Sequence, residues 1–166
     1  MRRRAGFSLI EVTIATMIVA VMMAASLSVL AASVRSREFV RRGAFAQSLA
    51  EQLMTEIGAK PYADPDGGAG LGLEEVAIGG SRVVFDDVDD YVGFAESPPV
   101  ENDGSAILGA ASYVRKVEVV WMDPSLKEES ATDTGIKRIT VVVTRRGVPI
   151  ATVTTLRTRV WEGVTP

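Results

Sequence analysis

Apolar and polar residues follow three successive patterns along the chain, and the first is an uninterrupted apolar segment. From Val12 to Val34 there are 23 residues without a charge, a proline or a glycine. About 20 such residues suffice for a helix to cross a bilayer. A lone segment in lipid must satisfy its backbone polar groups internally, which only a helix does. The first pattern therefore predicts a membrane-spanning helix.

The second pattern is an amphipathic continuation of that helix. Apolar residues recur at spacings of three, four and seven, which is helical periodicity, at Phe39, Ala46, Leu49, Leu53 and Ile57. Gly58 and the first proline of the chain, Pro61, supply a helix stop. We expect one helix from Phe7 to about Ile57, about 75 Å long at about 1.5 Å per residue.

The third pattern is the alternation of half-buried strands. Residues 113–122 place Tyr113, Arg115, Val117, Val119 and Trp121 on one face. The next strand, 137–144, has an apolar face of Ile139, Val141 and Val143, with Lys137, Arg138, Thr140 and Thr144 in more polar places. A turn at 145–147 leads into a last strand, 148–160.

Because these strands are consecutive and their connections are short, an antiparallel meander is the economical arrangement. The amphipathic half of the helix would cover its apolar face. The predicted fold class is therefore α+β, with one long N-terminal helix packed by its C-terminal half on a small antiparallel sheet.

Between the helix and the sheet, residues 61–112 are rich in glycine and proline and are predicted to be mostly loop. Residues 81–85 are expected to form one short strand. From Pro61 to Tyr113 there are eleven acidic residues and a single basic one, Arg82.

Glu11 interrupts the apolar character at the start of the membrane segment. A carboxylate within a bilayer costs at least a few kcal/mol unless it is near the interface or paired. No Lys, Arg or His lies within the next twenty residues of the chain. We therefore expect the partner of Glu11 to belong to another molecule.

The residues around Glu11 form a motif. Three arginines, Arg2–Arg4, precede Gly6-Phe7-Ser8-Leu9-Ile10-Glu11-Val12. This resembles the class III signal of type IV pilins and type II secretion pseudopilins. The resemblance implies that prepilin peptidase cuts between Gly6 and Phe7 and that the new terminal residue, Phe7, is N-methylated. It also implies that Glu11 helps the subunit enter a filament by meeting the terminal amine of a neighbour.

The same resemblance implies an organisation and a location. The regions are a leader (1–6), a transmembrane or filament-core helix (7–34), its amphipathic continuation (35–60), an acidic variable region (61–112) and the sheet (113–166). The expected protein is a minor pilin or an I-class minor pseudopilin. It would span the inner membrane once, with its N-terminus cytoplasmic and its head outside, and then join a pilus or pseudopilus. Many family members have a proline in the apolar half, and this chain has none there.

Other readings of the N-terminus remain open. An ordinary secretory signal has an apolar run of about 7–15 residues, which is shorter than the one present here. A single-span anchor would explain the length but not the order of residues around Glu11. In that case the protein would be a membrane-anchored binding module with an acidic, calcium-binding loop. A lipoprotein signal requires a cysteine, and the chain has none.

Composition narrows the function further. The net charge is −3, and removal of residues 1–6 would leave 15 basic against 21 acidic residues. Nucleic-acid binding depends on clustered cations, so we expect no nucleic-acid partner. The chain has no histidine, the commonest general base and metal ligand. Together with the absence of cysteine, this argues against an enzyme.

An acidic cluster in the loop region is the one candidate ion site. Asp86, Asp87, Asp89 and Asp90 place four carboxylates within five residues. Such groups repel one another unless they are solvated or joined by a cation, and Ca²⁺ takes six to eight oxygen ligands. The cluster is thus either a calcium site or an acidic surface loop with a hydrogen-bonding role at a turn.

Overall fold

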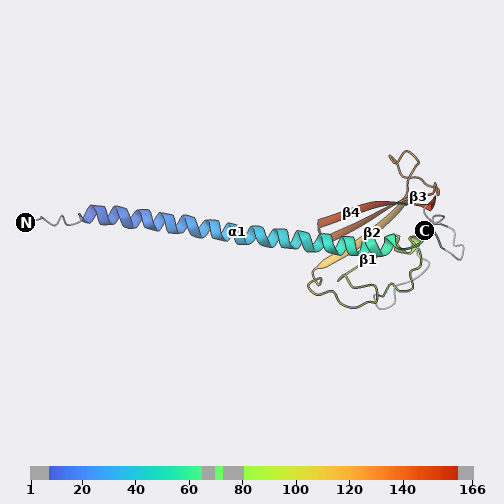
Figure 1. The fold of residues 1–166 in the computed structure, drawn as a ribbon, viewed down its shortest axis with the longest axis horizontal. Coiled ribbons are helices and arrows are strands. Elements are labelled where there is room, and N and C mark those ends of the chain that lie inside the picture. Colours follow the sequence, from blue (N-terminus) through green and yellow to red (C-terminus); the bar gives the residue numbers. More distant parts are fainter. Residues whose placement is uncertain (1–7, 65–69, 73–80, 161–166) are drawn as a thin grey trace, which may run out of the picture. The chain divides into compact units, whose positions relative to one another are not determined.

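The computed structural model describes residues 8–64, 70–72 and 81–160. Its elements are, in order, the helix α1 (Leu9–Gly58), a 3₁₀ turn (Asp89–Tyr91) and the strands β1 (Ala95–Glu96), β2 (Tyr113–Trp121), β3 (Ile136–Arg145) and β4 (Val148–Thr158) (Figure 1). The chain divides into two compact units, Met1–Arg42 and Gly43–Pro166. We call the second unit the head. The α+β fold class is confirmed.

In the head, the four strands form one antiparallel sheet in the order β1-β2-β3-β4. The predicted meander is therefore correct, and β2, β3 and β4 lie where alternation placed them. The sequence did not indicate β1, which is only two residues long and pairs Glu96 with Arg115.

The expected strand at 81–85 is wrong. The amide of Phe85 donates to the carbonyl of Arg82 at 3.0 Å, so the chain turns here. The physical reason is the position of Arg82, whose side chain is completely buried and ion-paired. Because the Arg82 side chain is held inside the head, the backbone bends at this point. The apolar residues of 81–85 by themselves had resembled a strand.

The head core forms where α1 packs on the inner face of the sheet. The buried residues of α1 are Ala46, Leu49, Ala50, Leu53 and Ile57. They face the buried residues of β2 and β3, namely Tyr113, Val117, Val119, Ile139, Val141 and Val143. Phe39, which was grouped with the helix stripe, is 78% exposed and lies outside it.

The β3–β4 hairpin closes through a tight turn. Arg146 and Gly147 both have positive φ, 53° and 78°. Two central residues with positive φ define the I′ type of turn, whose twist matches that of antiparallel strands. Gly147 adopts this conformation at no steric cost, so the turn signal read from the sequence has a direct structural basis.

Five buried or half-buried side chains form what we call the arginine network: Glu56, Arg82, Tyr91, Glu96 and Arg115. Arg82 contacts Glu56 and Glu96 at 2.8 Å each. Arg115 pairs with the other oxygen of Glu96, and the Tyr91 hydroxyl donates to Glu56 at 2.8 Å. Burial alone would raise the pKa of Glu56, but the hydrogen bonds and charge of Arg82, with help from Tyr91, hold it below its ordinary value.

The arginine network joins four parts of the head. Glu56 belongs to α1, Arg82 to the loop region, Glu96 to β1 and Arg115 to β2. Arg115 also donates to the backbone carbonyl of Leu49 on α1, at 3.2 Å. Since the chain has no cysteine, these charge-assisted contacts tie the loop region to the helix and sheet without a disulfide.

A second buried pair lies at the other end of the sheet. Lys137, expected in a polar place, is 1% exposed, which corrects that prediction. Its ammonium group pairs with Asp89 at 2.8 Å and lies 3.9 Å from the centre of the Tyr62 ring. Lys137 alternates in phase with Ile139 and Val141, so the strand period places it on the inner face, where Asp89 compensates its charge.

We expect Arg82→Met to lower the free energy of unfolding of the detergent-solubilised protein by about 3 kcal/mol or more, because two carboxylates would lose their buried cation. Denaturant titration followed by circular dichroism measures this. The matched control is Arg138→Met, which removes a cation from the exposed pair with Glu129 and should cost about 1 kcal/mol or less. Equal losses in the two variants would contradict the assigned role of Arg82.

Candidate functional site

The first unit presents an apolar helix surface with nothing packed on it among the described residues. Every side chain of α1 from Leu9 to Arg37 is exposed. Within the described part of the chain, α1 is the one helix long and apolar enough to span a membrane, with a mean hydropathy of 2.3 over its most apolar window. A continuous apolar surface of this extent requires lipid or partner helices to cover it.

Four hydroxyl groups on this surface, those of Thr13, Thr16, Ser26 and Ser28, are bonded to the backbone of the helix itself. Thr13 and Thr16 donate to the carbonyls of Ile10 and Thr13, at 2.8 and 2.9 Å. Ser26 donates in the same way to Met22, at 2.8 Å. Side chains bonded back to the preceding turn expose no unpaired hydroxyl proton, so these residues are compatible with a hydrocarbon environment.

Glu11 lies in the first turn of α1 and is exposed. Its amide donates to the carbonyl of Ser8 at 3.0 Å, while its carboxylate has no ionic or hydrogen-bond partner among the described residues. The positive end of the helix dipole favours an anion here. The expected cleavage and methylation residues, Gly6 and Phe7, lie outside the described residues, so their roles and that of Glu11 stay predictions.

A charged collar closes the apolar segment. Arg35 and Arg37 follow it, and Glu38 pairs with Arg41 at 2.9 Å and Arg42 at 2.8 Å. The hydrogen bond from Arg42 is the main reason that the pKa of Glu38 lies below its ordinary value. With a single carboxylate among four guanidinium groups, the collar is net positive and marks where α1 would leave the hydrocarbon.

The acidic cluster is an internally bonded turn. The Asp87 carboxylate accepts the amides of Asp89 and Asp90, the latter at 3.2 Å. The Asp90 carboxylate accepts the amide of Asp86 at 2.9 Å. Asp89 pairs with Lys137. Of the two readings of the sequence, these contacts favour the hydrogen-bonding turn.

The burial of the turn differs from the surface loop that was expected. Asp87 is 3% exposed, and Asp89 and Asp90 are also buried, whereas Asp86 is exposed. Among the described residues, no three or more acidic side chains are grouped so as to hold a metal ion. Binding of Ca²⁺ at Asp86, Asp87, Asp89 or Asp90 stays a prediction, and the described geometry gives it no support.

Burial changes the titration of this turn. It raises the pKa of Asp87 to about 6, from an ordinary value of 3.8, and the hydrogen bonds from the Asp89 and Asp90 amides only partly oppose this. Burial also raises the pKa of Asp89, against the charge of Lys137. Asp87 therefore changes its charge at mildly acidic pH.

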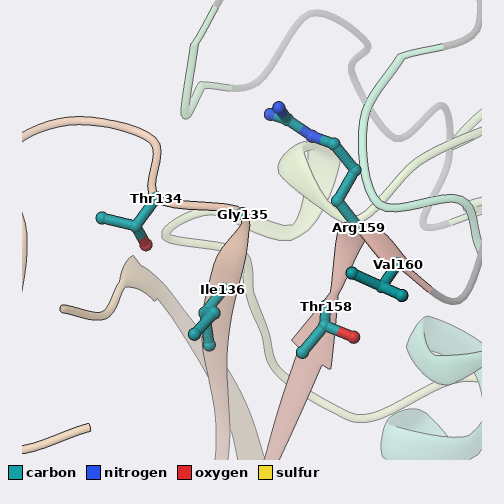
Figure 2. Close-up of a pocket in the computed structure, with 6 residues that line it drawn as sticks. All are labelled: Thr134, Gly135, Ile136, Thr158, Arg159 and Val160. Carbon is teal, nitrogen blue, oxygen red and sulfur yellow. The ribbon is translucent and has the colours of Figure 1, made fainter. Parts of the chain in front are cut away.

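A shallow hollow of about 480 Å³ lies where β3 begins and β4 ends. Its lining residues are Thr134, Gly135, Ile136, Thr158, Arg159 and Val160 (Figure 2). Figure 2 shows the Arg159 side chain directed away from the short side chains of Ile136 and Thr158. Arg159 is also paired with Asp133. The hollow therefore offers no grouped polar chemistry for a substrate.

Sequence reasoning missed the arginine network, although two signals pointed to it. Arg82 is the one cation in a long acidic stretch, which is typical of a residue that compensates buried carboxylates. Arg115 shares a strand face with Val117 and Val119. A cation on an apolar face requires a buried anion, but its identity, Glu96, depends on the fold.

Comparison with known proteins identifies the N-terminal segment. The model of the prokaryotic N-terminal methylation motif matches residues 1–27. The chain thus carries the signal of type IV pilins and pseudopilins, as its first residues predicted. No curated protein and no solved structure matches the chain.

We expect Asp87→Asn to stabilise the head near neutral pH. An amide oxygen still accepts the two backbone amides, but the buried charge is gone. Because the folded-state pKa of Asp87 is raised to about 6, this group's stabilising contribution is complete below about pH 4 and is lost as the pH rises through 6.

The variant should therefore gain about 1–2 kcal/mol over the natural chain near pH 7, and the gain should vanish near pH 4. Denaturant titrations at a series of pH values measure it. Asp103→Asn, at an exposed aspartate, is the control and should show no such gain. A gain of Asp87→Asn that does not depend on pH would contradict the burial argument.

Proposed function

We propose that this chain is a structural minor subunit, a minor pilin or pseudopilin, of a type IV pilus or type II secretion system. One observation carries the proposal: the N-terminal methylation motif continues into an exposed apolar helix whose single charged residue before the collar is Glu11. The motif supports a processed, pilin-like subunit. The minor role and the kind of system belong to the proposal.

Processing comes first in the proposed mechanism. The precursor enters the inner membrane through its apolar helix, with Arg2–Arg4 on the cytoplasmic side and the head outside. Prepilin peptidase then cuts between Gly6 and Phe7 and Phe7 is methylated. The motif and the apolar helix together fit a single-pass membrane protein. Cleavage exposes a positive terminal amine four residues before Glu11.

Assembly is the second step. When helices leave lipid to pack side by side, their apolar surface is covered by lipid before assembly and by other helices afterwards. Burial of this surface therefore contributes little net free energy to assembly. Close packing and pairing of polar groups therefore decide the equilibrium. A carboxylate in a low-dielectric filament core requires a cation and hydrogen bonds. The methylated amine of a neighbouring pilin would supply both the cation and the hydrogen bonds to Glu11. Other pilins would thereby become partners of the chain.

The head supports a structural role rather than an enzymatic one. Its buried cations are paired inside the arginine network or in the Asp89–Lys137 pair, and the buried carboxylates of Asp87 and Asp90 accept hydrogen bonds from backbone amides. These groups hold the fold together and are not directed into the described hollow. A small head without cysteine suits a minor component, most like the I-class minor pseudopilins, and its acidic balance disfavours nucleic acid as a partner.

The alternative is a single-span, membrane-anchored binding module with an acidic, calcium-binding loop. The buried position of Asp87 and Asp90 and their bonds to backbone amides argue against it. An anchor would keep its first six residues, and its melting temperature would rise with added calcium. Mass spectrometry of the mature N-terminus and a calcium titration therefore separate the two functions.

Glu11→Ala should leave membrane insertion and leader removal intact but reduce incorporation into filaments by about tenfold or more, since a buried charge pair is worth at least a few kcal/mol. Immunoblots of sheared filaments against membrane fractions measure this. The control is Ser26→Ala, which removes a satisfied hydroxyl from the same helix surface. Normal incorporation of Glu11→Ala would exclude the proposed pairing.

Gly6→Leu should accumulate as an uncleaved precursor, because a bulky side chain would occupy the position after which the peptidase cuts. Intact-protein mass spectrometry should show retention of residues 1–6 and no methyl group. Ala5→Leu, one residue earlier, is the control and should be processed. If Gly6→Leu is cut at the normal rate, the assigned cleavage site is wrong.

A further inference from the structure

Three segments meet at the end of the head where α1 enters it. The rings of Phe45 and Tyr113 are 5.4 Å apart in an edge-to-face contact. A side chain added at Gly109 would contact Phe45 at 3.7 Å. Tyr113 pairs with Arg145 across β2 and β3, and the Arg145 guanidinium lies 5.5 Å from the Tyr113 ring. This end of the head is thus formed by the part of α1 that begins at Gly43, the loop before β2 and the β3–β4 turn.

The outward side of this end is both apolar and basic. Leu108 is 96% exposed, and Val148 is 58% exposed. Arg146 is also exposed, at a turn whose conformation directs it away from the sheet. Arg145 is held at the base of the turn by its hydrogen bond to the Ser112 hydroxyl, at 3.0 Å. We call Leu108, Arg145, Arg146 and Val148 the entry face.

The charges of the head are segregated with respect to the entry face. From Gly43 to Pro166 the chain has 11 basic and 19 acidic residues. Yet the three segments that meet here, 43–50, 106–114 and 141–153, contain two arginines and not one acidic residue. Two arginines, with no acidic residue in the three segments, thus lie beside exposed leucine and valine at the end where the head begins.

Chain length keeps the entry face near the bilayer. Gly43 follows Val34, the last apolar residue of the span, by nine residues. Nine residues reach about 30 Å when fully extended and about 13 Å when helical. The headgroup layer itself extends about 5–7 Å beyond the hydrocarbon, and the Debye length is about 8 Å at physiological salt. Residues 35–43 are helical in α1, so the shorter figure applies and anionic headgroups are within electrostatic range of Gly43.

We propose that the entry face docks on anionic phospholipid headgroups of the membrane in which the helix is anchored, before the subunit joins a filament. Arg145 and Arg146 contact the phosphates, and Leu108 and Val148 enter the interfacial layer. Basic residues beside apolar ones are the chemistry that recognises an anionic bilayer surface. The inference depends on the membrane anchoring in the proposed function but not on Glu11 or on leader cleavage.

A second copy of the chain is a less suitable partner. Several carboxylates of its acidic region, including Asp87, Asp89 and Glu96, are already engaged within the head. They are not available to arginines of a neighbour. Anionic lipid, in contrast, surrounds every anchored subunit at high local concentration, so weak contacts suffice.

The test uses the full-length chain in bilayers, with one cysteine introduced into a sequence that has none. Ala111→Cys carries a fluorescent label beside the entry face, and Ser125→Cys carries it in the β2–β3 connection, past the far end of β2; both positions are exposed. Lipids with a nitroxide on the headgroup quench a label that approaches the surface. Bilayers contain either phosphatidylcholine alone or about one-third phosphatidylglycerol.

We expect quenching of the Ala111→Cys label to be about twofold stronger in the anionic bilayers and to weaken as NaCl rises from about 0.05 to about 0.5 M. The Ser125→Cys label should not respond. Arg145→Gln with Arg146→Gln should abolish the difference, and Arg146→Gln alone, at an exposed turn residue, should reduce it. Lys116→Gln with Lys127→Gln removes the same charge elsewhere and should leave it unchanged.

Equal quenching in both bilayers, or an unaltered response in the Arg145 and Arg146 variants, would overturn the proposal. So would energy transfer between labelled copies that is independent of lipid, because it would assign the entry face to a second subunit. Resistance of the chain to alkaline extraction is measured in the same samples. Failure of that control would instead refute the membrane anchoring on which the proposed function depends.

Discussion

Pairing of buried charges is the interaction on which the head depends. Arg82 and Arg115 are both fully buried, and an uncompensated cation in that position would destabilise the fold by several kcal/mol. Glu56 and Glu96 provide the compensation from α1 and β1. The pairs are therefore geometric constraints: the loop region cannot move away from the helix without exposing the carboxylates or leaving the guanidinium groups unpaired. A protein without cysteine thus fixes a long irregular segment through electrostatics and packing.

The first unit has the opposite character. Its helix surface is exposed, several of its hydroxyls are bonded to the helix backbone, and the one acidic residue before the collar has no partner among the described residues. No described residue covers the apolar surface of this helix, so lipid or other helices must cover it. In the head the buried cations are paired with carboxylates of the same chain, whereas we predict that Glu11 is neutralised by a second molecule. The head therefore completes its own packing, while the apolar helix surface does not.

The acidic turn is the part of the head in which buried carboxylates are held mainly by backbone amides. Asp87 and Asp90 accept hydrogen bonds from backbone amides, and Asp89 is neutralised by Lys137. Carboxylates so placed stabilise the turn through hydrogen bonds, while burial raises the pKa of Asp87. Four aspartates within five residues suggested an ion site. The sequence alone does not show which groups their carboxylate oxygens contact.

The sequence by itself determined the long helix, the three long strands, their meander and the N-terminal motif, because these depend on local periodicity and on residue order. The strand alternation also puts Arg115 and Lys137 on the same face as the buried strand residues, although we expected Lys137 to lie in a polar place. Only the tertiary structure decided that 81–85 turns instead of forming a strand, that β1 exists, and that Glu56 and Glu96 meet Arg82. These features arise between residues up to forty positions apart, and pairing at that separation leaves no period in the chain. Burial is a property of the packed head, so the difference between a solvated acidic loop and a buried, hydrogen-bonded turn was fixed there as well.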